Sequence, residues 1–239
     1  MSEARERLIV ALDVPTAAQA RQLVAAVGDA ASFYKVGKQL FTAEGPPVVR
    51  DLVASGRKVF LDLKYHDIPN TVAEAVRAAS HLGVSMLNVH ASGGSKMLRA
   101  AAEAAAQSEA KPKVLAVTVL TSLSDQDLQE IGVSGRAMDQ VLRLAQLARA
   151  NGCLGVVASA REAKEIRREI GEGFLIVTPG VRPAGASLDD QARHVTPAEA
   201  MSSGATHIVV GRPISAAADP AKAARAVVEE MESALVAMK

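Results

Sequence analysis

The sequence predicts an α/β protein built as one closed (β/α)8 barrel spanning residues 1–239. Three observations favour this fold. The chain has 239 residues, close to the ~250 that are typical of eight βα units. Short runs rich in β-branched residues alternate with alanine-rich stretches from end to end. The first four strand-like runs begin near Leu8, Phe33, Lys58 and Val84, at intervals of 25, 25 and 26 residues, which suit one strand, one helix and their loops.

Eight such units follow one another along the chain. The predicted strands begin near Leu8 (LIVALD), Phe33 (FYKVG), Lys58 (KVFLDLK), Val84 (VSMLNVH), Lys113 (KVLAVTVL), Leu154 (LGVVAS), Phe174 (FLIVTPG) and His207 (HIVVGR). The predicted helices have helical spacing or an N-cap-like start, and are Thr16–Val27, Pro46–Ala54, Thr71–Leu82, Ser95–Ala106, Met138–Ala150, Ala160–Ile170, Thr196–Ser203 and Ala221–Ala237. Strict alternation implies a parallel sheet, and eight strands close it. An open doubly wound sheet is the main alternative, but eight evenly weighted units leave no obvious edge strand.

The composition limits which classes of partner the protein could bind. The chain is 49% hydrophobic, 22% charged and only 3% aromatic, with a formal net charge of +1. A neutral, aromatic-poor surface suits nucleic acid badly, because binding needs phosphate-neutralising charge or stacking rings. The apolar run Leu8–Leu12 is cut off by Asp13 and is too short for a signal peptide or a membrane span. Cys153 is the single cysteine, so we expect a reducing compartment, the cytoplasm, and no membrane partner.

Strand parity brings charged side chains together. In the third strand Asp62 and Lys64 share a face with Phe60, while the opposite face is apolar and should meet the surrounding helices. By the same rule Asp13, as the last residue of strand one, and Lys35, on strand two, point into the barrel. All four would converge on the C-terminal mouth, where barrels of this kind place their active sites.

A charged residue at a strand end is more often a solvated rim residue or half of a structural ion pair. Two inward charges on one buried strand, Asp62 and Lys64, are harder to explain in that way, because burying them is expensive. A third charge, Asp67, follows within a few residues. The cluster therefore favours chemistry over a purely structural role.

The segment Asp62–Thr71, DLKYHDIPNT, resembles the signature of the orotidine 5′-phosphate decarboxylases. Other motifs fall in that family's order across all eight predicted strands: ALD (Ala11–Asp13), YKVG (Tyr34–Gly37), VTVLTS (Val117–Ser122), TPGVRP (Thr178–Pro183) and VVGRPI (Val209–Ile214). The resemblance implies a homodimeric, metal-independent enzyme without a cofactor. It would convert orotidine 5′-phosphate to uridine 5′-phosphate in de novo pyrimidine biosynthesis.

The resemblance also implies roles for the charged cluster. Lys64 would donate the proton to C6 of the pyrimidine, Asp62 would lie beside the substrate carboxylate, and Lys35 would hold Asp62 and the ribose. Asp67 would complete an alternating Lys-Asp-Lys-Asp array in the neighbouring subunit's site. Such chemistry leaves an electron pair on a vinylic carbon with no π-system to accept it, and a preorganised ammonium stabilises that charge.

Further residues would bind the nucleotide. Gly211 and Arg212 follow strand eight, and Arg182 and Gln191 bracket the loop after strand seven, the two loops with which barrels commonly bind phosphate. The segment Val181–Asp190 is typical of a mobile lid. The full set of substrate-binding candidates is Asp13, Lys35, Asp62, Thr71, Thr121, Arg182, Gln191, Gly211 and Arg212, with Thr71 reaching across the dimer.

Other conspicuous residues have simpler interpretations. We expect His90 to be a hydrogen-bonded structural residue behind the cluster, His66 to face outward or cap the following helix, and Cys153 to lie in the core. No His/Asp/Glu cluster has metal-ligand spacing, and no GxGxxG opens a helix after strand one.

Two alternatives remain. One is a metal-dependent sugar-phosphate decarboxylase or epimerase that shares the Asp-x-Lys strand; the sequence Asp-Ile-Pro-Asn-Thr after that strand argues against it. The other is a non-catalytic barrel that binds a phosphorylated ligand, which would have little reason to bury two acid–base pairs.

Overall fold

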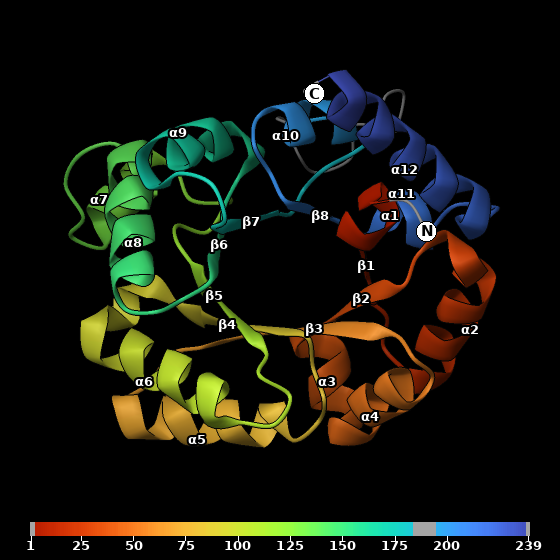
Figure 1. Cartoon of the computed structure of the whole chain (residues 1–239), viewed down its shortest axis with the longest axis horizontal. Coiled ribbons are helices and arrows are strands. Elements are labelled where there is room, and N and C mark those ends of the chain that lie inside the picture. Colours follow the sequence, from red (N-terminus) through yellow and green to blue (C-terminus); the bar gives the residue numbers. More distant parts are fainter. Residues whose placement is uncertain (1–2, 184–194, 238–239) are drawn as a thin grey trace.

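Eight parallel strands close into a barrel in the order β1 to β8 (Figure 1). The structure is a computed structural model and describes residues 3–183 and 195–237. Each strand pairs in parallel with its sequence neighbours, and β8 pairs with β1. The strands are β1 (Leu8–Ala11), β2 (Phe33–Gly37), β3 (Lys58–Tyr65), β4 (Met86–His90), β5 (Lys113–Val117), β6 (Gly155–Val157), β7 (Leu175–Thr178) and β8 (His207–Val210). The predicted barrel is confirmed and the open-sheet alternative is wrong.

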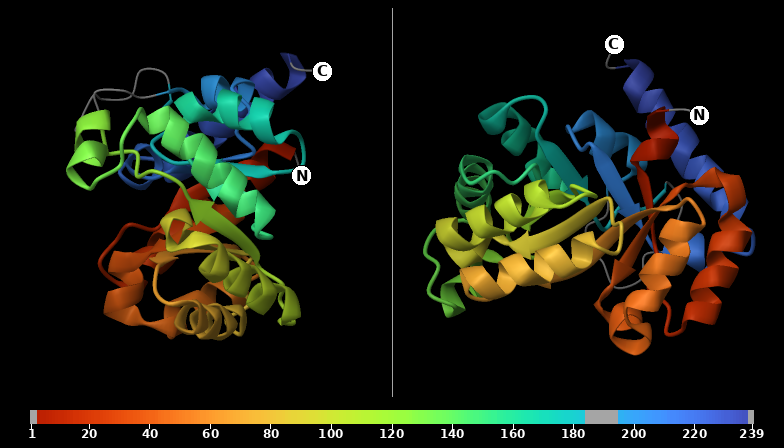
Figure 2. Two further views of the ribbon diagram at one scale, coloured as in Figure 1. Left: turned by 90° about the vertical axis from the view of Figure 1, so that its left-hand side faces the viewer. Right: turned by 60° about the horizontal axis from the view of Figure 1, so that its bottom comes forward.

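Helices surround the strands on the outside, with α5 packed beside α6 and α12 beside α1 (Figure 2). The longer helices are α2 (Ala17–Val27), α4 (Pro46–Ala54), α5 (Pro69–Ser80), α6 (Gly94–Gln107), α8 (Ala137–Ala150), α9 (Ala160–Ile170) and α12 (Pro220–Ala237). The shorter ones are α1 (Glu3–Arg7), α3 (Lys38–Glu44), α7 (Asp125–Glu130), α10 (Pro197–Ser202) and α11 (Arg212–Ser215), with 3-10 turns η1 (Gly28–Ala30) and η2 (Ala91–Gly93). All eight predicted helices are present, whereas α1, α3, α7 and α11 were not predicted. Among the described residues, no helix is both long and apolar enough to cross a bilayer.

The hydrophobic core forms two layers, as strand parity requires. One cluster fills the barrel and is made of Ile9, Ala11, Phe33, Phe60, Met86, Leu115, Val177 and Val209. The other lies between the strands and the helices, and contains residues that alternate with these, such as Val10, Tyr34 and Leu61. Phe60 is therefore inward, which places Asp62, two residues further along β3, toward the barrel interior at its C-terminal end.

The pairing of β3 with β4 is irregular near the end of β3. Leu61 pairs with Leu87 and Tyr65 with Val89, so four residues of β3 span what two residues span on β4. Lys64 takes up part of this irregularity with a left-handed backbone, φ 53°. Lys64 Nζ nevertheless lies 2.5 Å from Asp62 Oδ1, so the two side chains meet at the barrel mouth as predicted, although the strand that carries them is not regular there. Asp13 also differs from its prediction, because β1 ends at Ala11 and Asp13 lies in the following loop.

Candidate active site

Four charged side chains form a chain of ion pairs at the C-terminal mouth of the barrel. Lys35 Nζ lies 2.8 Å from Asp13 Oδ1 and 3.4 Å from Asp62 Oδ2. Asp62 Oδ1 lies 2.5 Å from Lys64 Nζ. The side chain of Asp13 is 59% exposed, whereas those of Lys35, Asp62 and Lys64 are 10%, 13% and 24% exposed. Because the signs alternate, each charge in this row of four lies beside an opposite charge.

Asp62 is the centre of this arrangement. Burial by itself would raise the pKa of Asp62, but the charges of Lys35 and Lys64, with hydrogen bonds from Lys64 and Asn88, outweigh it and hold the pKa below its usual range. Asp62 is therefore ionised at neutral pH. The site thus presents a fixed carboxylate between two ammonium groups.

Asn88 is a member of this cluster that the sequence analysis missed. It is completely buried on β4, and its Nδ2 donates to Asp62 Oδ1 at 2.7 Å. Its Oδ1 accepts the backbone N–H of Lys64 at 2.8 Å. The available signal was parity, since Asn88 is a polar residue two positions after the inward Met86, between the apolar Leu87 and Val89.

Gly37, at the end of β2, makes room for the ion pair. A Cβ at this position would lie 3.0 Å from Lys35 Nζ and 3.3 Å from Asp13 Oδ1. Any larger residue would therefore push against the ammonium group. The YKVG motif thus supplies both the lysine and the space that its charged end occupies.

Two histidines lie beside the cluster. The rings of His66 and His90 have centroids 5.5 Å apart. Burial, followed by the nearby charges of His66, Lys38 and Lys64, lowers the pKa of His90. His90 is thus neutral at physiological pH. His66 does not cap α5, whose N-cap is Ile68.

Asp67 and Thr71 lie apart from the array within one chain. Both are exposed, and Asp67 Oδ1 accepts the backbone N–H of its neighbour Ile68 at 2.6 Å. No ion pair found among residues 3–183 and 195–237 joins Asp67 to Lys35 or Lys64. The array in one chain therefore contains Asp13, Lys35, Asp62 and Lys64.

The remaining nucleotide-binding candidates belong to the segments after β5, β7 and β8. Gly211 lies close to the array, because a Cβ there would be 3.9 Å from Asp13 Oδ2. Arg212 follows it and is exposed at the start of α11, whereas Arg182, in the segment after β7, is buried. Thr121 is exposed in the segment after β5. Gln191 and most of the proposed lid, Val181–Asp190, lie outside the described residues.

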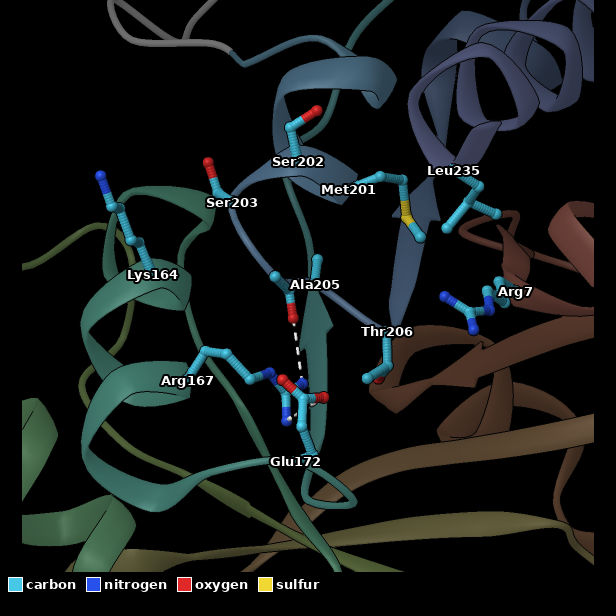
Figure 3. Close-up of a pocket in the computed structure, with 11 residues that line it drawn as sticks. Arg7, Lys164, Arg167, Glu172, Met201, Ser202, Ser203, Ala205, Thr206 and Leu235 are labelled. Atoms are coloured by element: carbon cyan, nitrogen blue, oxygen red, sulfur yellow. Dashed lines mark hydrogen bonds and ion pairs between the residues drawn. The ribbon is translucent and has the colours of Figure 1, made fainter. Parts of the chain in front are cut away.

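A separate cavity lies at the opposite end of the barrel (Figure 3). It has a volume of about 270 Å³, and its lining includes Arg7, directly before β1, and Thr206, directly before β8. Arg167 also lines it but donates to the carbonyl groups of Gly171 at 2.8 Å and Gly204 at 3.0 Å. These bonds tie α9 to neighbouring turns. Arg167 thus has a structural role.

Cys153 is buried, and burial raises the pKa of its thiol to about 12. It is therefore a core residue, as expected, with little tendency to form the nucleophilic thiolate. In the part of the chain that the structure describes, no group of three or more His, Cys, Asp or Glu side chains could hold a metal ion.

Comparison with known proteins identifies relatives along almost the whole chain. The family model described as "Orotidine 5'-phosphate decarboxylase / HUMPS family" matches residues 6–227. The orotidine 5′-phosphate decarboxylase of Halorhodospira halophila is 57% identical over 228 residues, which cover 95% of this chain and 97% of the relative. That of Moorella thermoacetica is 53% identical and covers 96% and 93%.

Solved structures agree in fold. The crystal structure of orotidine 5′-phosphate decarboxylase from Lactobacillus acidophilus has a TM-score of 0.85 at 41% identity, and covers 95% of this chain and 99% of that one. The corresponding structure from Pyrococcus horikoshii has a TM-score of 0.78 at 26% identity, and covers 94% and 99%.

Proposed function

The chain belongs to the orotidine 5′-phosphate decarboxylase family, and from this premise we propose how its charged array performs the reaction. The family and the relatives make the chain an enzyme that decarboxylates orotidine 5′-phosphate in pyrimidine biosynthesis. Our proposal is that the reaction is metal-independent and passes through a C6 carbanion that Lys64 protonates. The observation that carries it is the contact of Lys64 Nζ with Asp62, an ionised carboxylate whose side chain is only 13% exposed.

The proposed reaction needs only the residues of the array and solvent water. The bond between C6 and the carboxylate breaks, CO₂ leaves, and the electron pair stays on C6. Lys64 then transfers one proton from Nζ to C6, which yields uridine 5′-phosphate and a neutral amine. Solvent reprotonates the amine before the next turnover. An ammonium fixed in place before the reaction stabilises the developing charge without reorganisation.

Asp62 has two roles in this proposal. It keeps the Lys64 ammonium in place through a short charged contact. It also faces the substrate carboxylate, and repulsion that disappears as CO₂ forms would lower the barrier. Lys35 holds Asp62 from the opposite side and would reach the ribose together with Asp13.

Phosphate binding is assigned to the loops after β7 and β8. Gly211 would allow a ligand to approach the backbone next to Asp13, and Arg212 would offer charge-assisted donors to the phosphate dianion. Arg182 and Gln191 would complete this grip, and Thr121 would contact the nucleotide from the segment after β5. The two loops lie where barrels commonly bind phosphate, which supports the assignment.

We also propose that the enzyme is cytoplasmic and forms a homodimer, in which Asp67 and Thr71 act in the partner's site. Asp67 is an exposed carboxylate that lacks an ion pair with its own chain's lysines in the described residues. The adjacent Ile68 is 67% exposed. Packing of this segment against a second chain would bury Ile68 and bring Asp67 to lysines of the partner.

A chelator assay tests the proposed reaction. The protein is incubated with orotidine 5′-phosphate and excess chelator while the pyrimidine ultraviolet band is followed. The chain contains no Trp and two Tyr, so its own absorbance interferes little. We expect turnover at the same rate with and without chelator. Loss of turnover on chelation that returns with a divalent metal would contradict the metal-independent mechanism.

A further inference from the structure

Asn88 occupies a position between the two groups that are proposed to carry the reaction. It is completely buried, and its amide makes two hydrogen bonds, to the carboxylate of Asp62 and to the backbone N–H of Lys64. Neither bond is needed to pair β4 with its neighbours, because both leave from the side chain. The amide therefore links the end of β3 to the interior face of β4.

The orientation of this amide is fixed by its partners. A backbone N–H can only donate, so the atom facing Lys64 N must be the amide oxygen. The ionised carboxylate of Asp62 can only accept, so the atom facing it must be the amide nitrogen. Both requirements give the same orientation, and no other neutral side chain of this size supplies an acceptor and a donor in this way.

The bond to Lys64 stabilises an unusual backbone. Lys64 has φ 53°, a left-handed conformation that residues with a Cβ rarely adopt. The β3–β4 register shifts in the same segment, between Leu61 and Tyr65. The Lys64 N–H thus donates to the Asn88 side chain at the point where the strand ladder is irregular. The amide supplies the acceptor in this irregular stretch of the ladder.

We propose that Asn88 is a positioning residue of the decarboxylase reaction, which fixes the backbone from which Lys64 projects and the carboxylate oxygen that Lys64 contacts. This inference rests on the proposed function of Lys64 and Asp62. Asp62 Oδ1 receives both Asn88 Nδ2 at 2.7 Å and Lys64 Nζ at 2.5 Å. The two bonds from Asn88 therefore set both ends of the contact that aims the ammonium at C6.

Replacement of Asn88 by Ala tests this role against a matched control. Asn151 is also buried and also uses both amide atoms, accepting from Arg99 Nη2 at 3.1 Å and donating to Leu147 O at 2.8 Å, at the C-terminal end of α8. Both substitutions remove a satisfied amide, so both should lower the melting temperature. Only Asn88→Ala should lower kcat, by roughly 100-fold, because misplacing a reacting group by about 1 Å costs that much.

Comparing ligand binding with kcat distinguishes a positioning role of Asn88 from a role in folding alone. In Asn88→Ala the KM for orotidine 5′-phosphate and the affinity for uridine 5′-phosphate should stay within about threefold of the parent, since Asn88 itself holds neither ligand. The parent is assayed alongside. If the parent turns over and Asn88→Ala keeps kcat within about threefold of it, the positioning role is wrong. If the parent itself fails, the proposed function has failed instead.

Asn88→Asp should change the pH profile of the reaction, which would stay the same if Asn88 had only a structural role. The aspartate keeps the side-chain shape and an oxygen for the Lys64 N–H, but it places a second carboxylate oxygen near Asp62 Oδ1. The charged and titratable groups facing this pair are Lys35 from β2, Lys64 from β3 and His90 at the end of β4, with Asp13 beyond Lys35. Two carboxylates this close bind one proton at a higher pH than Asp62 alone.

The pH profile of Asn88→Asp should therefore differ from that of the parent. The acidic limb of kcat/KM, where Asp62 gains a proton, should move upward by about one pH unit or more. Asn151→Asp, the matched control, should leave the limb in place. An Asn88→Asp enzyme that folds but keeps the parent's acidic limb would show that Asn88 does not act on Asp62.

Discussion

At Lys64 the left-handed backbone costs on the order of 1–2 kcal/mol, and the surrounding bonds explain why the folded chain keeps it. The N–H of Lys64 donates to Asn88 and its ammonium contacts Asp62. A regular strand would give the lysine the inward direction but not this fixed approach to the carboxylate. The irregular backbone is thus part of what aims the proposed proton donor.

Parity predicted which charged residues face inward, because alternation depends only on local geometry. It correctly predicted that Lys35 and Asp62 point into the barrel, and that Asp13 lies at the same C-terminal mouth. It also puts Asn88 on the inward face of its strand, but a neutral amide gives no indication of its role until its partners on β3 are known. The irregular backbone at Lys64 could not be predicted either, because it depends on how β3 pairs with β4.

At the same scale, Arg212 gives a test of phosphate binding. Arg212→Ala should weaken binding of uridine 5′-phosphate by roughly 100-fold and of uridine hardly at all, because the guanidinium acts on the dianion. Titration of both ligands checks this, with Arg225→Ala, an exposed arginine on α12, as the control. Equal losses for nucleotide and nucleoside would mean that Arg212 supports the fold.

Among the elements, the longer helices and the strands were predictable because each carries a full hydrophobic period. The strand expected from Val84 begins at Met86, and the helix expected from Thr71 begins two residues earlier, at Pro69. The seven-residue α3 was missed because it spans fewer than two full turns and directly follows β2. Short helices of this kind are set by the loops around them, which local periodicity does not describe.

The connection from β3 to α5 determines where Asp67 can act. β3 ends at Tyr65 and α5 begins at Pro69, so Asp67 lies on the segment that leaves the barrel mouth. Lys64→Ala and Asp67→Ala proteins should each be nearly inactive alone. Mixed in equal amounts with proven subunit exchange, they should recover roughly a quarter of native activity, because half of the dimers are hybrid and each hybrid has one intact site. A mixture as inactive as its components would show that Asp67 does not act across the interface.

For the whole molecule, two half-buried groups outside the array give stability opposite dependences on pH. Burial lowers the pKa of His207, at the start of β8, from 6.5 to about 4. Burial raises the pKa of Glu162, in α9, from 4.5 to about 7. The stability linked to His207 is complete above pH 6.5 and is lost as pH falls toward 4. That linked to Glu162 is complete below pH 4.5 and is lost as pH rises toward 7.

The two effects, each on the order of 3 kcal/mol, should largely offset each other between pH 4.5 and 6.5. His207→Gln should therefore lose stability as pH rises through this window, relative to the parent. Glu162→Gln, which keeps the capping acceptor for Ser159 N, should gain it. Melting temperatures across the window measure both slopes. Parallel curves for the two variants would show that these groups do not set the pH dependence.

The central claim, that Lys64 protonates C6, is tested most directly by the reverse of that step. In D₂O the parent should exchange the C6 hydrogen of uridine 5′-phosphate for deuterium, because the amine that donates a proton to C6 must also be able to remove it. Proton NMR follows the loss of the C6–H signal. Lys64→Ala should bind the nucleotide, as a titration confirms, and show no exchange above the rate in buffer. Exchange by this variant within tenfold of the parent would contradict the assignment.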